Sequence, residues 1–227
     1  MIINDELLFK HGAILKSYDE NDIIFKEGIQ AKYYYQIQVG TVKICNTFDD
    51  GKEFAHGFPF VGHCFGESYL LTDKPYAINV VALTASVIIC LPKTAYLDLV
   101  VDNPQVLLDV NRYTAERLHF RYLVSSFLAI SDPLIKIQKL LDHLKDYFGY
   151  TELYSFQVPF TRNQLASLTG LRVETIIRVI KKCKHQGFSK LITVKFFISV
   201  NRVCLMWICR IFKIKTQLMS GLLSSKL

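Results

Sequence analysis

The chain shows two kinds of hydrophobic pattern, one typical of short strands and one typical of helices. A helical lead-in is predicted over residues 1–17, with Ile14 among the residues that it buries. From Tyr18 onward, apolar positions recur at every second residue, which is the spacing of half-buried strands. The clearest run places Tyr35, Ile37 and Val39 on one face and Gln36 and Gln38 on the other.

Turn signals separate these strands. Asp49-Asp50-Gly51 predicts a hairpin turn, while Gly28 and Gly40 end other apolar runs. Many short strands joined by regularly spaced turns are typical of a β-roll or barrel. The first part of the chain is therefore predicted to be a β-roll.

A long helix is predicted from about Gln105 to Ala129, after the sequence Asn103-Pro104. Its apolar residues form two stripes, so that one stripe can pack on the roll while the other faces a second copy of the chain. The alternative is a core helix without a dimer contact. The first stripe contains Val106, Val110, Phe120, Val124 and Phe127, and the second contains Leu107, Leu118 and Leu128.

Beyond a hinge at Ser131-Asp132-Pro133, the pattern becomes helical again. Asp132 can cap the next helix and Pro133 suits its first turn, which predicts a helix over residues 134–148. A strand pair over residues 150–159, two further helices and a wing after Gly187 would complete a winged-helix domain.

The stretch from Phe160 to Cys183 predicts a helix-turn-helix. Thr161 can accept hydrogen bonds from the free amides of a first helix, and Gly170 suits a tight turn between two helices. The second helix is expected to bury Val173, Ile176, Ile177 and Ile180 and to expose Glu174, Arg178, Lys181 and Lys182. Such a charged face suits a DNA major groove, although an ordinary helical hairpin with a solvated face has the same pattern.

The distribution of charge favours the DNA interpretation. Residues 161–227 contain thirteen Lys or Arg and one acid, Glu174, a net charge of +12, whereas residues 1–160 contain 14 basic and 19 acidic side chains, a net charge of −5. The overall charge of +7 hides this division. A polyanion-binding part joined to a mildly acidic part is the simplest explanation.

Composition predicts a two-domain cytoplasmic protein of the α+β class. The 227 residues are 51% apolar and 21% charged, and neither a membrane span nor a signal peptide is recognisable. We expect a β-roll sensor domain over residues 1–104, a dimerisation helix and hinge over 105–131, and a winged helix-turn-helix over 132–200. Residues 201–227 form an apolar and basic tail, interpreted as an added helix, a membrane-surface segment or sequence read in a shifted frame.

No constellation of residues indicates an enzyme, a metal site or a cofactor. The sequence has no phosphate-cradling glycine loop, nucleophile elbow or paired metal ligands, and its six histidines are scattered. The cysteines never stand at C-x-x-C spacing and are interpreted as buried thiols. They are Cys45, Cys64, Cys90, Cys183, Cys204 and Cys209.

The segment Leu171-Arg172-Val173-Glu174-Thr175-Ile176-Ile177-Arg178 resembles the recognition helix of Crp/Fnr transcription regulators, in particular the Fnr branch. The resemblance extends over nearly the whole chain to about Phe188. It implies that Glu174 and Arg178 read bases and that Thr161, Arg162 and Thr175 contact the DNA backbone. Ile177 stands where that branch usually has Ser, and Arg172 stands where a Ser or Thr cap is common.

The resemblance also implies a cyclic-nucleotide-binding jelly roll with its pocket near Phe65-Gly66-Glu67-Ser68. That family follows this segment with an Arg-Ser pair, in which the arginine neutralises the phosphate, but here Tyr76-Ala77 occupies the place. Cyclic AMP is therefore not expected as effector, and Gly66 and Glu67 are more simply explained by a turn and a helix start. Arg121 and Tyr122 stand where relatives touch the nucleotide from the long helix, which leaves a small anionic effector open. The cysteine array that holds an iron–sulfur cluster in some relatives is absent.

The function expected from these observations is sequence-specific DNA binding as a homodimer on an inverted repeat, with RNA polymerase as a further partner. Residues expected at the DNA also include Ile177, Lys181, Lys182 and Arg172. The alternative is a ligand-binding module that acts through protein partners and has an impaired DNA-binding part.

Overall fold

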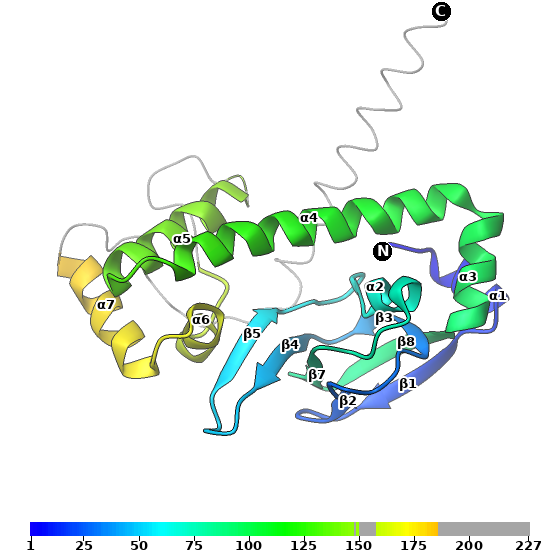
Figure 1. Ribbon diagram of the computed structural model, residues 1–227, viewed down its shortest axis with the longest axis horizontal. Coiled ribbons are helices and arrows are strands. Elements are labelled where there is room, and N and C mark those ends of the chain that lie inside the picture. The colour runs from blue at the N-terminus through cyan, green and yellow to red at the C-terminus, as the bar shows by residue number, and fades with distance from the viewer. Residues whose placement is uncertain (148, 150–157, 186–227) are drawn as a thin grey trace, which may run out of the picture.

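The structure is a computed structural model that describes residues 1–147, 149 and 158–185 of the chain. A β-rich part and a smaller helical part lie side by side, and one long helix runs along both of them (Figure 1). The strand pair expected over 150–159, the wing after Gly187 and the tail over 201–227 fall almost entirely outside the described residues.

The β-rich part consists of two four-stranded antiparallel sheets, with strand orders β1-β8-β3-β6 and β2-β7-β4-β5. Side chains from both sheets form one continuous core, which confirms the predicted roll. The strands are β1 (Ile14–Tyr18), β2 (Ile23–Phe25), β3 (Tyr33–Val39), β4 (Val42–Thr47), β5 (Glu53–Gly57), β6 (Cys64–Phe65), β7 (Asn79–Ala82) and β8 (Ser86–Pro92). Three helices accompany them: α1 (Asp5–Lys10), α2 (Glu67–Thr72) and α3 (Lys93–Asp102), the last of which the sequence analysis missed.

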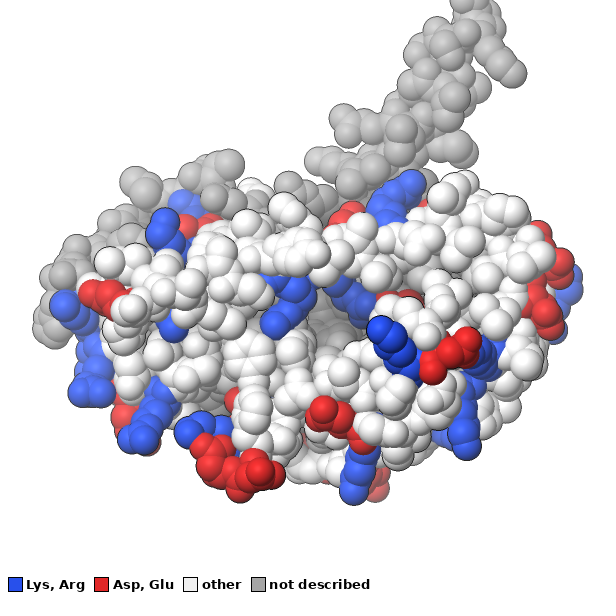
Figure 2. Space-filling model, in the orientation of Figure 1, with Lys and Arg blue, Asp and Glu red and all other residues white. Residues whose placement is uncertain are grey.

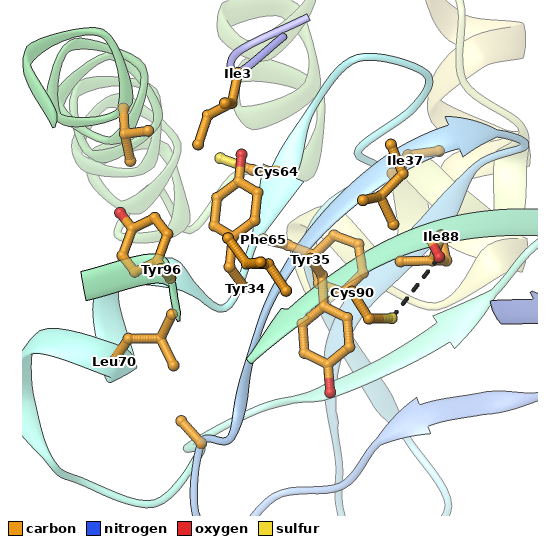
Figure 3. Packing of buried hydrophobic residues seen from close by; sticks show 14 of the residues in the cluster. Ile3, Tyr34, Tyr35, Ile37, Cys64, Phe65, Leu70, Ile88, Cys90 and Tyr96 are labelled. Carbon is orange, nitrogen blue, oxygen red and sulfur yellow. Dashed lines mark hydrogen bonds between the residues drawn. The ribbon is translucent and has the colours of Figure 1, made fainter. Parts of the chain in front are cut away.

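Strand β3 departs from the predicted alternation because both of its faces are covered. Tyr35 and Ile37 lie in the core between the sheets, while Tyr34 stacks on Tyr96 of α3 with ring centroids 5.0 Å apart (Figure 3). Gln36 is fully buried, where its amide accepts from the Ile3 nitrogen at 3.0 Å and donates to the Ile3 oxygen at 2.8 Å. A glutamine predicted to face solvent therefore fastens the N-terminal segment to the roll.

Two further expectations at the strands were wrong. Val39 is 51% exposed, because the register of β3 against β8 shifts between Ile37 and Val39. Ile14 is 50% exposed in β1 rather than buried in a helix. The lead-in helix ends at Lys10, and β1 is an edge strand that pairs only with β8.

The long helix α4 (Pro104–Leu128) packs on two cores in succession rather than presenting two complete stripes. Val110 and Tyr113 belong to the core of the roll, whereas Val124 belongs to a second core, against which Phe120 and Phe127 are partly buried. The predicted first stripe therefore faces the chain's own interior. In the second predicted stripe only Leu118 is strongly exposed, at 49%, because Leu107 packs against the roll and Leu128 is half-buried.

The second core joins α4 to three helices: α5 (Pro133–Tyr147), α6 (Arg162–Thr169) and α7 (Val173–His185). Asp132 caps α5 as predicted, its Oδ1 accepting from the Leu134 nitrogen at 2.7 Å. Helix α6 also packs against β5, and Phe58 contacts Phe160 with ring centroids 5.7 Å apart. Among the described helices, none combines the length and apolar content that crossing a bilayer demands.

Candidate nucleic-acid interface and effector site

The helix-turn-helix begins with a complete capping box at Thr161. The Thr161 hydroxyl accepts from the Gln164 nitrogen at 2.9 Å, and the Gln164 side chain accepts from the Thr161 nitrogen at 2.7 Å. Two amides that no helical carbonyl can reach are thereby satisfied. Leu165 and Ala166 are buried about one turn further on and belong to the second core, which fixes α6 on it.

The turn between the two helices depends on Gly170. Its φ of +66° lies in the left-handed region, which residues with a Cβ rarely adopt. Helix α7 then starts at Val173 and buries Ile176, Val179, Ile180 and Cys183 against α5 and α6. The prediction of this motif and of its boundaries is confirmed. Two expected core residues differ: Val179 is buried in place of Ile177, which is half-buried, and Val173 is also half-buried.

The outer face of α7 carries the side chains that the sequence analysis assigned to DNA. Glu174, Arg178, Lys181 and Lys182 are exposed, as is Arg172 immediately before the helix. Thr175 is half-buried and its hydroxyl accepts from Arg178 at 3.5 Å. On the preceding helix, Arg162 is exposed and Thr161 half-buried. Figure 2 shows Lys and Arg side chains gathered at the end of the molecule where α7 lies.

In the roll, the expected effector site is closed by the chain's own groups. Gly66 has φ +77° and starts α2, and the next residue, Glu67, is 2% exposed. Glu67 Oε1 accepts from Thr114 Oγ1 at 2.9 Å and forms an ion pair with Arg117, both from α4. Arg117 also donates to the Cys64 oxygen at 3.0 Å. The carboxylate thus connects α2 to the long helix.

The electrostatics of this contact favour the charged form of Arg117. Burial alone would lower the pKa of Arg117, but the adjacent Glu67 carboxylate contributes to a net rise above its usual range. Oε2 of Glu67 has no hydrogen-bond partner in the described part of the chain.

Tyr76 fills the place at which the family's phosphate-binding arginine is expected. The side chain is 2% exposed, and its ring stacks on Phe25 at a centroid distance of 3.7 Å. Tyr69 approaches the same ring edge-on at 5.2 Å. A Cβ added to Gly66 would lie 3.4 Å from both the Phe25 and the Tyr76 rings, so these rings already occupy the surroundings of the glycine.

The structure brings together only some of the predicted effector residues. Gly66, Glu67 and Tyr76 are adjacent, but Ser68 is exposed and Tyr122 is 66% exposed on the outer side of α4. Ala77 is exposed, and its oxygen accepts from Asn46 at 2.8 Å.

Three participants were missed by sequence reasoning: Phe25, Thr114 and Arg117. The last two share a helix face with Arg121 through three- and four-residue spacing, which was the available signal.

Arg121 lies further along that face, against β5. Its guanidinium donates to the His56 oxygen at 3.3 Å and stands over the Phe54 ring, 5.5 Å from its centroid. His56 donates or accepts through Nε2 with Asn46 Oδ1 at 2.6 Å. Burial, followed by the charge of Arg121, lowers the pKa of His56 to about 4, so the ring is neutral near pH 7.

Comparison with known proteins agrees with both parts of this arrangement. The model for the cyclic nucleotide-binding domain matches residues 15–103. The cAMP-activated global transcriptional regulator CRP of Haemophilus influenzae is 26% identical over 175 residues, which cover 76% of this chain and 78% of the relative. These matches identify a cyclic nucleotide-binding domain in the roll and show that the chain resembles Crp/Fnr-type regulators over most of its length.

Other Crp/Fnr relatives extend this result. The CRP-like cAMP-activated global transcriptional regulator of Mycobacterium tuberculosis is 25% identical, covering 74% of this chain and 76% of the relative. The c-di-GMP responsive global regulator CLP of Xanthomonas campestris has the same fold, with a TM-score of 0.67, 24% identity, and coverage of 81% of this chain and 91% of CLP. The chain thus has a cyclic nucleotide-binding domain, and the relatives that resemble it over about three quarters of its length are transcription regulators.

Proposed function

We propose that the chain is a homodimer that binds an inverted repeat in DNA through α7 and is not controlled by cyclic AMP. The observation that carries this proposal is the outer face of α7, where a carboxylate and several cations are exposed on a helix whose other face is buried. A helix held in this way on a capped partner helix is suited to the major groove.

The proposed roles follow from side-chain chemistry. Arg178 can donate two hydrogen bonds to a guanine, and Glu174 can accept from a cytosine on the opposite strand. Ile177, half-buried at the edge of α7, offers an apolar contact to a thymine methyl. The remaining candidates would contact phosphates and orient the helix. They are Thr161, Arg162, Arg172, Thr175, Lys181 and Lys182.

The proposed dimer contact is the outer stripe of α4, which we define as Leu108, Ala115, Leu118 and Tyr122. All four are exposed, with Leu108 at 56%, Leu118 at 49% and Tyr122 at 66%. Their spacing, with exposed Asn111 and Ser125 at the intervening positions, alternates between three and four residues as in a parallel coiled coil. The proposed organisation is thus a sensor roll over 1–104, a dimer helix and hinge over 105–131, and the DNA-binding part from 132.

Cyclic AMP is excluded in this proposal because its phosphate would lack a partner and its space is filled. Tyr76 replaces the arginine and packs on Phe25, and the Arg117 charge is engaged by Glu67. An unpaired buried phosphate would cost several kcal/mol. Calorimetry of the chain with micromolar cyclic AMP should show no heat of binding, and a micromolar dissociation constant would contradict this part of the proposal.

Random-sequence selection tests the DNA-binding proposal. The selected sequences should contain an inverted repeat whose half-sites contain a TGA-like core and lie about one helical turn, roughly 34 Å, apart. Arg178→Ala should cost about 1–3 kcal/mol and relax the preference at one guanine, whereas Lys181→Ala should weaken all sequences alike and reduce the salt dependence. Selection of no palindrome, or an unchanged preference in Arg178→Ala, would show that α7 does not read the sequence.

A further inference from the structure

Four aromatic rings form a continuous cluster beside Gly66, which we call the aromatic plug: Phe25, Tyr35, Phe65 and Tyr76. Tyr76 stacks on Phe25 with ring centroids 3.7 Å apart, and the Phe25 ring lies 6.1 Å from that of Phe65. Phe65 in turn stacks on Tyr35 at 5.2 Å (Figure 3). All four side chains are buried in the core of the roll. The plug is therefore part of the packed interior, where each ring holds its neighbours in place.

The backbone that carries Tyr76 is fastened to the rest of the roll. The Tyr76 nitrogen donates to the Ile29 oxygen at 2.9 Å, and the Tyr76 oxygen accepts from the Gly28 nitrogen at 2.7 Å. The oxygen of the next residue, Ala77, accepts from the Asn46 side chain of β4 at 2.8 Å. The position of the Tyr76 ring is thus set by these hydrogen bonds as well as by packing.

A second set of contacts joins the same region to the long helix. Gly66 starts α2, and the buried carboxylate of Glu67 pairs with Arg117 and accepts from Thr114, both from α4. Removing one partner of a buried ion pair leaves the other charge unpaired, which is strongly unfavourable. The position of α4 against α2 is therefore maintained by the chain's own side chains.

The DNA-binding part is docked on the roll in the same arrangement. Helix α6 packs on β5, and Phe58 contacts Phe160 just before the cap of α6, with ring centroids 5.7 Å apart. This docking leaves the outer face of α7 open, since Glu174 and Arg178 are exposed. The contact that holds the helix-turn-helix thus does not cover the side chains proposed to read DNA.

We propose that these contacts hold the chain in its DNA-binding arrangement, with the aromatic plug in the place of a small-molecule effector, so that binding to the inverted repeat requires no ligand. The inference rests on the proposed function and extends it, because it removes the need for any effector and not only for cyclic AMP. A ligand shifts a conformational equilibrium only through a difference in its affinity for the two states. Here the space beside Gly66 is filled, and the buried carboxylate next to it is engaged by α4.

The DNA affinity of a ligand-stripped chain tests the proposal. The full chain is unfolded in urea, dialysed and refolded, and its binding to the selected inverted repeat is measured by fluorescence anisotropy. The added probes are cyclic AMP, cyclic di-GMP and the protein-free extract of the cells that produced the chain. Each probe should change the dissociation constant by less than about 5-fold, the lower end of typical allosteric coupling. A larger gain in affinity with any probe would overturn the proposal.

Two variants test the role of the plug. Tyr76→Ala removes the ring, and Tyr76→Phe is the matched control because it retains the ring. At a temperature where circular dichroism shows both variants folded, Tyr76→Ala should bind the repeat about 2- to 30-fold more weakly, whereas Tyr76→Phe should bind as the unaltered chain does. Both should bind non-specific DNA equally, because that affinity depends on phosphate contacts. Equal affinities of the two variants for the repeat would contradict the role of the plug.

Hydrogen–deuterium exchange without DNA separates this inference from the proposed function. Peptides of β5 and α6 should exchange slowly in the stripped chain, and the extract should leave their rates unchanged. Phe58→Ala should speed exchange in α6, while Phe48→Ala, at an exposed ring beyond β4, should not. Slower exchange of α6 with the extract would overturn the inference. If no inverted repeat is selected but exchange is independent of the extract, the DNA proposal fails and the ligand-free docking is supported.

Discussion

Two substitutions at Tyr76 are expected to change stability in opposite directions. The ring is buried against Phe25, Tyr69 and Gly66. Its hydroxyl forms no hydrogen bond of normal geometry among the residues described, although the Tyr35 hydroxyl and the Lys32 backbone lie close enough to act on its pKa. Tyr76→Phe retains the packing and removes the unpaired hydroxyl. Tyr76→Ala removes both and leaves a cavity.

The magnitudes follow from those contacts. A buried polar atom without a partner costs about 1–3 kcal/mol. Removing the hydroxyl also removes the contacts that its oxygen makes, so Tyr76→Phe should raise the free energy of unfolding by only up to about 1 kcal/mol. Replacing a buried aromatic ring by Ala costs about 3–5 kcal/mol, which is the expected difference between the Phe and Ala variants. Relative to the unaltered chain, Tyr76→Ala should therefore be destabilised by about 2–4 kcal/mol.

Urea denaturation followed by far-ultraviolet circular dichroism measures both effects, provided that the slopes of the transitions agree. A clear loss of stability in Tyr76→Phe would refute the reasoning about the hydroxyl. A Tyr76→Ala variant as stable as Tyr76→Phe would show that the ring does not fill the site. The argument that Tyr76 occupies the space needed by cyclic AMP would then fail.

Three further predictions concern the dimer, the cap and pH. Leu118→Asp should convert the dimer to a monomer, as measured by sedimentation, because it places a charge in the outer stripe. Ile135→Asp, at a residue that is 44% exposed on α5, should leave the dimer intact. A Leu118→Asp variant that remains a dimer would show that the dimer contact lies elsewhere. Thr161→Ala should cost about 1 kcal/mol in urea unfolding because the capping box is lost, with exposed Asn163→Ala as the near-neutral control, and equal costs would contradict the capping argument. Burial, reinforced by the charges of Arg117 and the N-terminus, lowers the pKa of His63 from 6.5 to about 3. Between these two pH values the unfolded chain binds a proton that the folded chain does not bind. The free energy of unfolding should therefore fall by about 1.4 kcal/mol for each pH unit as the pH is lowered from 6.5 to about 3. His63→Asn should have the shallower slope of stability against pH, and parallel slopes would exclude His63 as the cause.

The helix-turn-helix could be predicted because its determinants are local. The cap at Thr161, the left-handed Gly170 and the periodicity of α7 lie within a short stretch, so each residue restricts its neighbours directly. Even there, the exchange of Ile177 for Val179 in the core depended on how α7 rotates against α5 and α6, and sequence periodicity fixes that rotation only approximately.

The closed effector site could be predicted only in part. Sequence comparison placed Tyr76 where an arginine is expected, but its stacking on Phe25 joins residues from distant parts of the chain. The pairing of Glu67 with Arg117 likewise spans 50 positions. The burial of Gln36 was hidden for the same reason, since its partner Ile3 lies 33 residues away and covers a face of β3 that alternation assigns to solvent.

The packing of α6 on β5 has a consequence for operator choice. In the proposed dimer, each helix-turn-helix packs on the roll of its own subunit. The distance between the two α7 helices therefore depends on the positions of the two rolls as well as on the hinge at Asp132. Strand β5 and the residue that follows it, Phe58, then act as a spacer beneath the DNA-binding part. Altering its thickness, for example at Phe58, would change which half-site spacing the protein accepts while every base-reading side chain stays the same.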